Sequence, residues 1–161
     1  MNFAHLLLGF DGRISRQPFW IGLAILAAAE LLARWLLGVP FFPQTMKPFP
    51  VRVTEAAIEL VTLYPTAAVV IKRLHDRNQP GIYAAWLIGI MLVVLVTDLL
   101  GLTDDPDNVS WLDWVLAFFV LGILLAFLIE LGFRRGTQGD NRYGPDPLGG
   151  PTLGSRGPEK T

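Results

Sequence analysis

The feature that most constrains this chain is a set of four long, mainly apolar stretches. Because an α-helix rises about 1.5 Å per residue and a bilayer core is about 30 Å thick, a membrane span needs roughly 20 such residues. Backbone groups in hydrocarbon must form their hydrogen bonds within the segment, so each stretch is expected to be a helix. The sequence therefore predicts an all-α membrane protein, a four-transmembrane-helix bundle with spans at residues 18–37, 54–71, 82–100 and 111–132.

The composition agrees with a membrane protein. Apolar residues make up 52% of the chain and charged residues only 17%, below the roughly 25% of soluble proteins. The second span is the weakest, since it contains Glu55, Glu59 and a central Pro65. The proline predicts a kink or local unwinding there. The proline-rich connection at residues 38–53 predicts an extended loop on the membrane surface.

The two termini differ in character. Residues 3–10 are apolar enough to lie in the headgroup region, which predicts a short N-terminal interfacial segment. Residues 148–161 contain glycine, proline and charge without an apolar set to bury, which predicts a disordered tail. Residues 1–147 are therefore expected to form a single membrane domain.

The distribution of basic residues predicts the orientation. Ten of the 13 lysines and arginines precede the first span, connect the second to the third, or follow the fourth. The loop at residues 101–110 has three aspartates and no basic residue. Because cytoplasmic loops retain lysine and arginine, both termini are expected in the cytoplasm.

Several classes of protein are disfavoured by what the sequence lacks. The chain has no cysteine, which excludes disulfides, iron–sulfur clusters, thiolate zinc sites and a cysteine nucleophile. Its net charge of -1 offers no basic field for nucleic acid. We expect no cofactor and no metal site, and we assign no catalytic residue.

Three polar segments are expected to meet at the cytoplasmic surface. They are residues 10–16, 72–77 and 139–147, and they include the motifs GRISRQPFW, KRLHDRNQPG and GDNRYGPDP. In order and spacing these motifs resemble the bacterial inner-membrane family called domain of unknown function 805, which includes the YhaH-like proteins. The resemblance covers nearly the whole chain. It implies a four-helix protein of the bacterial inner membrane and no established activity.

The polar segments are candidate binding elements for anionic lipid headgroups or for a protein partner, because guanidinium groups hold phosphate in bidentate contacts. The protein partner could also be a second copy of the same chain, in a homo-oligomer. The competing explanations are structural: topology signals near the membrane, a Ser15 helix cap, termination of the second helix, and a folded cap on the bundle. The candidate residues are Arg13, Arg16, Arg73, His75, Asp76, Asn141, Arg142 and Asp146.

Two further functions stay open. In an enzyme acting on a lipid phosphate, His75 would serve as a base with Asp76 to orient it, but no recognised catalytic motif is present. In a small transporter or channel subunit, Glu59 would change its charge along an ion path. The simpler interpretation is that Arg34 pairs with Glu30, four residues away on one helix face, and with Glu59 at similar depth.

Overall fold

The computed structural model describes residues 2–40, 47–102 and 111–149, except for the side chains of residues 112 and 113. Within these ranges the chain is helical and has no strand. Four helical stretches are long and apolar enough to cross a membrane: Arg16–Leu36, Phe49–Asp76, Gly81–Leu99 and Trp114–Phe133. The predicted all-α membrane fold is confirmed. The elements in order are α1 (Phe3–Leu8), α2 (Arg16–Leu36), α3 (Phe49–Asp76), the 3-10 turn η1 (Gly81–Tyr83), α4 (Ala84–Leu99), α5 (Trp111–Leu128) and the π-helical turn η3 (Ile129–Phe133).

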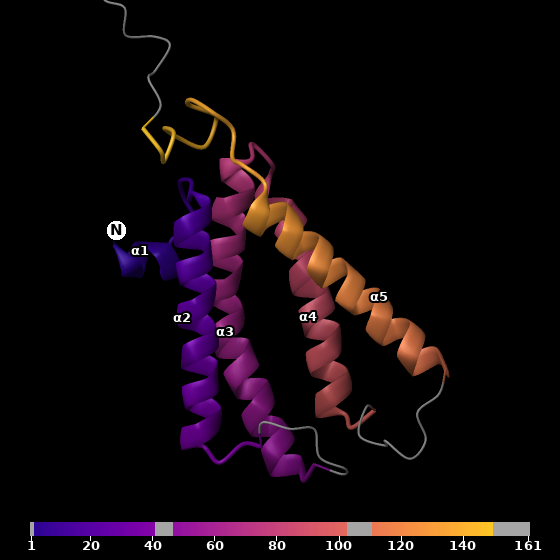
Figure 1. Cartoon of the computed structure of the whole chain (residues 1–161). Coiled ribbons are helices and arrows are strands. Elements are labelled where there is room, and N and C mark those ends of the chain that lie inside the picture. The colour runs from indigo at the N-terminus through magenta and orange to yellow at the C-terminus, as the bar shows by residue number, and fades with distance from the viewer. Residues whose placement is uncertain (1, 41–46, 103–110, 150–161) are drawn as a thin grey trace, which may run out of the picture.

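The helices are arranged around α3, which packs against α1, α2 and α4 (Figure 1). The short helix α1 lies across the side of the bundle, whereas α2, α3 and α4 run roughly side by side (Figure 1). Helix α5 meets the others where it ends and leans away from α4 toward its beginning (Figure 1). We call the end of the bundle where α2 begins and α3 ends the cap end.

Helix α3 extends beyond the predicted span in both directions. It begins at Phe49, inside the connection predicted to be extended, because Pro50 in the first turn loses no helical hydrogen bond. It continues to Asp76 because Lys72 and Arg73 are fully buried among protein partners and do not mark a membrane boundary. The helix is unbroken through Pro65, so the predicted local unwinding does not occur. Residues 41–46 of the connection lie outside the described residues.

The core is concentrated toward the cap end. Val69 and Val70 of α3 are buried against Phe19 of α2 and Leu131 of η3. By contrast, aromatic side chains of α5 such as Phe118 stay exposed, as expected for a lipid-facing helix. The cap end is therefore the best-packed part of the molecule.

The N-terminal segment is helix α1, and its ends are capped in different ways. The Asn2 side chain accepts hydrogen bonds from the amides of Ala4 and His5, at 3.0 and 3.4 Å. At the other end the buried Lys72 ammonium donates to the carbonyls of His5 and Leu6, both at 2.5 Å. A cation at these carbonyls complements the negative end of the short helix.

Two predicted details differ from the structure. Ser15 occupies the N-cap position of α2, but its side chain makes no capping hydrogen bond, so the hydroxyl cap predicted there is wrong. The disordered tail predicted for residues 148–161 falls outside the described residues from residue 150 onward.

Candidate functional site

The three polar segments come together at the cap end, and Arg13 lies at their junction. Its side chain is 1% exposed and pairs with Asp76 of α3 at 3.2 Å. It also donates to the carbonyls of Thr137, Gly139 and Gly144, at 2.6, 2.8 and 3.2 Å. One guanidinium thus links the segment before α2, the end of α3 and the chain after η3.

Arg73 is the second buried guanidinium, with a fully covered side chain. Its Nη1 pairs with the other oxygen of Asp76 and donates to the Ile14 carbonyl at 3.3 Å. Its Nε and Nη2 donate to the carbonyls of Leu131 and Arg134, at 2.6 and 2.5 Å. Asp76 therefore lies between two arginines, whose remaining donors bind backbone carbonyls of the protein.

The end of the fourth span is held by side chains from the other helices. The last carbonyls of a helix have no partner within it. Here Arg77 donates to Glu130 at 2.9 Å, Trp20 to Gly132 at 3.2 Å and Arg16 to Phe133 at 3.3 Å. Together with Arg73, these donors attach a helix that otherwise leans away from the bundle.

The third segment folds as a tight turn over the end of α3. Asn141 and Gly144 exchange backbone hydrogen bonds, and the Asn141 side chain accepts from the Tyr143 amide at 2.9 Å. The Asn141 amide group donates to the His75 carbonyl and to the Thr137 hydroxyl, both at 2.9 Å. The asparagine thereby closes the turn and attaches it to α3.

Gly136 allows the chain to cross directly above Asp76. A Cβ atom at this position would lie 2.0 Å from the Asp76 carboxylate. The Thr137 amide then donates to the Asp76 carbonyl at 2.8 Å. Any larger residue at 136 would separate the third segment from α3.

We call the three polar segments, assembled at the cap end, the cap. Within the cap, His75 makes contacts that the sequence did not indicate. Its Nδ1 lies 3.2 Å from the Gly12 carbonyl, and its ring stacks on Tyr143 with centroids 3.8 Å apart. A carbonyl partner requires the proton on Nδ1. Asp76 faces the two arginines and does not orient the imidazole, which removes the geometry suggested for a His75 base. Among the described residues, no group of three His, Asp or Glu side chains could hold a metal ion.

The turn also positions Asp146 and Arg142. Hydrogen bonds from the amides of Leu148 and Gly139 lower the pKa of the exposed Asp146 carboxyl. Arg142 donates to the Asn78 carbonyl at 3.2 Å and lies over the Tyr143 ring. Both side chains therefore have roles within the cap.

A pocket of about 300 Å³ opens beside the buried arginines, and we call it the cap pocket. Its sides include Ser15, Arg16 and Arg135, and its floor includes Arg73 and Asp76. Arg135 is exposed and makes no ion pair or hydrogen bond with the rest of the described chain. Arg135 was not among the candidate residues predicted from the sequence, and it differs from Arg134, which pairs with Glu130 at 2.7 Å.

A separate charged cluster lies at the opposite end of the bundle. Arg34 of α2 pairs with Glu30 at 3.1 Å and with Glu59 at 3.4 Å, and also with Glu55 at 3.0 Å. Lys47 joins Glu55 to Asp98, with both distances 2.9 Å. Glu55 was missed as a partner, although its four-residue spacing from Glu59 places both carboxylates on one face of α3.

Comparisons with known proteins agree with the fold. The sequence profile of the family described as "Protein of unknown function (DUF805)" matches residues 7–145. The Uncharacterized protein YiiR of Escherichia coli K12 is 36% identical over 148 residues, which cover 91% of this chain and 90% of the relative. The Inner membrane protein YhaI of the same strain is 27% identical over 143 residues, 87% of this chain and 86% of the relative. No solved structure matches.

Proposed function

The chain belongs to the DUF805 family, and from that premise we propose that it is an inner-membrane protein whose cap binds an anionic, phosphate-bearing lipid headgroup in the cap pocket. The relative YhaI, which is named as an inner membrane protein, supports this location. The observation that carries the proposal is Arg135, an exposed guanidinium that lines the pocket and makes no ion pair or hydrogen bond with the described chain.

The chemistry of the pocket suits a phosphate group. Arg16, Ser15 and Arg135 line the same volume. Guanidinium groups form bidentate, charge-assisted hydrogen bonds with phosphate oxygens. The carboxylates of Asp76 and Asp146 also line the pocket, and Asp76 is paired with Arg13 and Arg73, candidates from the sequence that therefore have protein partners.

The proposal includes an orientation with the cap end and both termini in the cytoplasm. The cap end carries most of the basic residues, as expected on the cytoplasmic side. We expect an alkaline phosphatase reporter inserted near Asp105 to be active and one fused after Thr161 to be inactive. The reverse pattern would refute this orientation.

Native mass spectrometry of the purified protein tests the headgroup site. Phosphatidylglycerol is added to the wild type and to the double variant Arg16→Gln with Arg135→Gln, and phosphatidylcholine serves as the lipid control. We expect discrete phosphatidylglycerol adducts on the wild type and at least about a hundredfold weaker binding by the double variant, since two charge-assisted hydrogen bonds are lost and each contributes about 1.5–3 kcal/mol.

Arg142→Gln is the control at the cap end because it removes a positive charge that does not line the pocket; it removes one charge, whereas the double variant removes two. It should bind phosphatidylglycerol like the wild type. Equal losses in both variants would mean that net charge alone attracts the lipid, and unchanged binding in the double variant would exclude this pocket.

A further inference from the structure

A row of cavities runs along the inner side of α5. The cavity nearest the cap end has a volume of about 390 Å³, the next about 280 Å³ and the third about 240 Å³. The first two share Phe127 and Leu131 as lining residues, and the second and third share Met91 and Leu124. We call this row the α5 groove. It follows the divergence of α5 from α4 (Figure 1).

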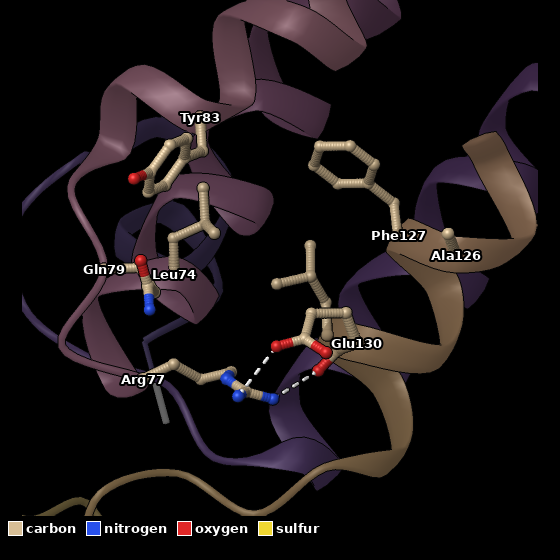
Figure 2. A pocket seen from close by; sticks show the side chains of 8 residues that line it. Leu74, Arg77, Gln79, Tyr83, Ala126, Phe127 and Glu130 are labelled. Carbon is tan, nitrogen blue, oxygen red and sulfur yellow. Dashed lines mark hydrogen bonds and ion pairs between the residues drawn. The ribbon is translucent and has the colours of Figure 1, made fainter.

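The groove changes character along its length. The middle cavity is lined by apolar side chains from four helices, with Thr66 as its single polar lining residue. The mouth, at the cap end, carries Arg77, Gln79, Tyr83 and Glu130 above an apolar floor (Figure 2). The third cavity carries Glu30, Glu59 and Thr62 beside apolar side chains, so the apolar part of the groove is the middle cavity. A polar mouth above this apolar part matches an amphiphile with a compact polar head.

The charges at the mouth indicate which kind of polar headgroup could bind there. Arg77 and Arg134 both pair with Glu130, each at 2.7 Å, so two guanidiniums share one carboxylate and leave one positive charge in excess. The Nε of Arg77 is enclosed by protein and is not reached from the cavity. Its Nη atoms bind Glu130, so a phosphate at the mouth would balance the excess positive charge of the three side chains.

We propose that the α5 groove holds one phospholipid, with its phosphodiester at Arg77 and one acyl chain along the apolar middle cavity toward Met91 and Leu124. This site is distinct from the cap pocket and does not depend on it. The lipid would fill the space between α4 and α5 that their side chains leave open. Glu130, between two arginines, would also face an amine on the headgroup.

A bound phospholipid explains the mouth better than a second copy of the chain. A protein helix entering the groove would fill its apolar part but would bring no anion to Arg77. Bulk lipid would fill the apolar part without selecting a phosphate. The excess positive charge at the mouth therefore favours a specifically held phospholipid.

Two tryptophan variants of α5 test the site. Ala126 lines the mouth, so Ala126→Trp should block it. Ala117, nine residues earlier, lies about half a turn around the helix and is exposed, so Ala117→Trp is the matched control. A third variant, Arg77→Met, keeps an unbranched apolar stem in place of the arginine stem and removes the guanidinium donors.

Each protein is stripped of lipid in detergent, and native mass spectrometry then measures rebinding of phosphatidylethanolamine, phosphatidylglycerol and diacylglycerol. We expect one tightly retained phospholipid per chain in the wild type and in Ala117→Trp. Ala126→Trp and Arg77→Met should show about tenfold lower occupancy, as expected for loss of a charge-assisted contact. Diacylglycerol, which lacks phosphate, should bind poorly to every protein.

The outcomes separate this site from the alternatives. Retention of either phospholipid supports the site, and a preference for phosphatidylethanolamine assigns the amine contact to Glu130. Equal retention by the two tryptophan variants, equal binding of diacylglycerol, or a lipid-free dimer would overturn the proposal. The double variant of Arg16 and Arg135 should keep this lipid, so the failure of one site is distinguishable from the failure of the other.

Discussion

The two ends of the bundle both contain arginine–carboxylate clusters, but the clusters are built in opposite ways. At the cap end two arginines surround one aspartate, and all three side chains are at most 4% exposed. At the opposite end one arginine, Arg34, serves three glutamates, two of which are 37% exposed. The first cluster has excess donors and the second has excess acceptors.

The excess donors of the cap have a structural use. Arg13 and Arg73 direct them to backbone carbonyls of segments far apart in the sequence, including Gly139 and Leu131. Arg34 contacts only side chains, on its own helix and on the neighbouring α3. The cap cluster therefore joins loops to helices, whereas the opposite cluster pairs charged side chains of α2, α3 and α4 and of Lys47.

The largest effect should come from removing the shared carboxylate of the cap. Asp76→Ala would leave two buried guanidiniums without a counter-charge, a change that typically costs about 3–5 kcal/mol. We expect the variant to unfold at much lower temperature in detergent, or to fail to accumulate. Asp140→Ala, at an exposed position in the same cap, is the control, and similar melting temperatures for the two variants would refute the role of the buried cluster.

The next effect tests the close crossing above Asp76. In Gly136→Ala the added methyl group would collide with the carboxylate, and overpacking of this kind costs about 1–3 kcal/mol. Thermal unfolding should show this loss. Residues 137–148 should also become more sensitive to proteolysis, because Tyr143 no longer holds the turn on His75. Gly122→Ala on α5 meets no atom within 4 Å and should be neutral. Equal stability of both variants would contradict the crossing geometry.

A smaller effect is expected at the opposite end. Glu59→Gln removes one of three carboxylates around Arg34, whose other two partners remain, so the loss should be about 1 kcal/mol. The melting temperature in detergent measures it, with Thr62→Ser on the same helix as the control. An unchanged stability together with a lost ion flux in vesicles would contradict the structural interpretation of Glu59.

The smallest effect is the change in stability of the cap end at acidic pH. Because the folded cap lowers the pKa of Asp146, its contribution to stability is present above the unfolded pKa, near 3.8, and is lost as the pH falls through the lower folded value. Hydrogen exchange at the Gly139 and Leu148 amides, corrected for intrinsic rates, should accelerate over that range. In Asp146→Asn the exchange should vary less with pH, and an identical pH profile would exclude Asp146 as the cause.

Much of the fold could be predicted because membrane spans follow from length and apolarity alone. The motifs also indicated which three segments meet at the cap end. The end of α3 was missed because Lys72 and Arg73 looked like the boundary of a span, whereas they donate to buried backbone carbonyls. The sequence also gives no sign that Arg135 lies beside a pocket, although the four-residue spacing from Glu130 indicates a partner for Arg134.

The sequence by itself determined four apolar helices, a basic end and an acidic loop, since these depend on composition and on solvation by the bilayer. Only the tertiary structure decided which arginines are available for a ligand. Their partners are largely backbone carbonyls, which every residue carries and no sequence pattern marks. Which carbonyl approaches Arg13 or Arg73 depends on how the segments pack, and this packing leaves Arg135 open to the cap pocket.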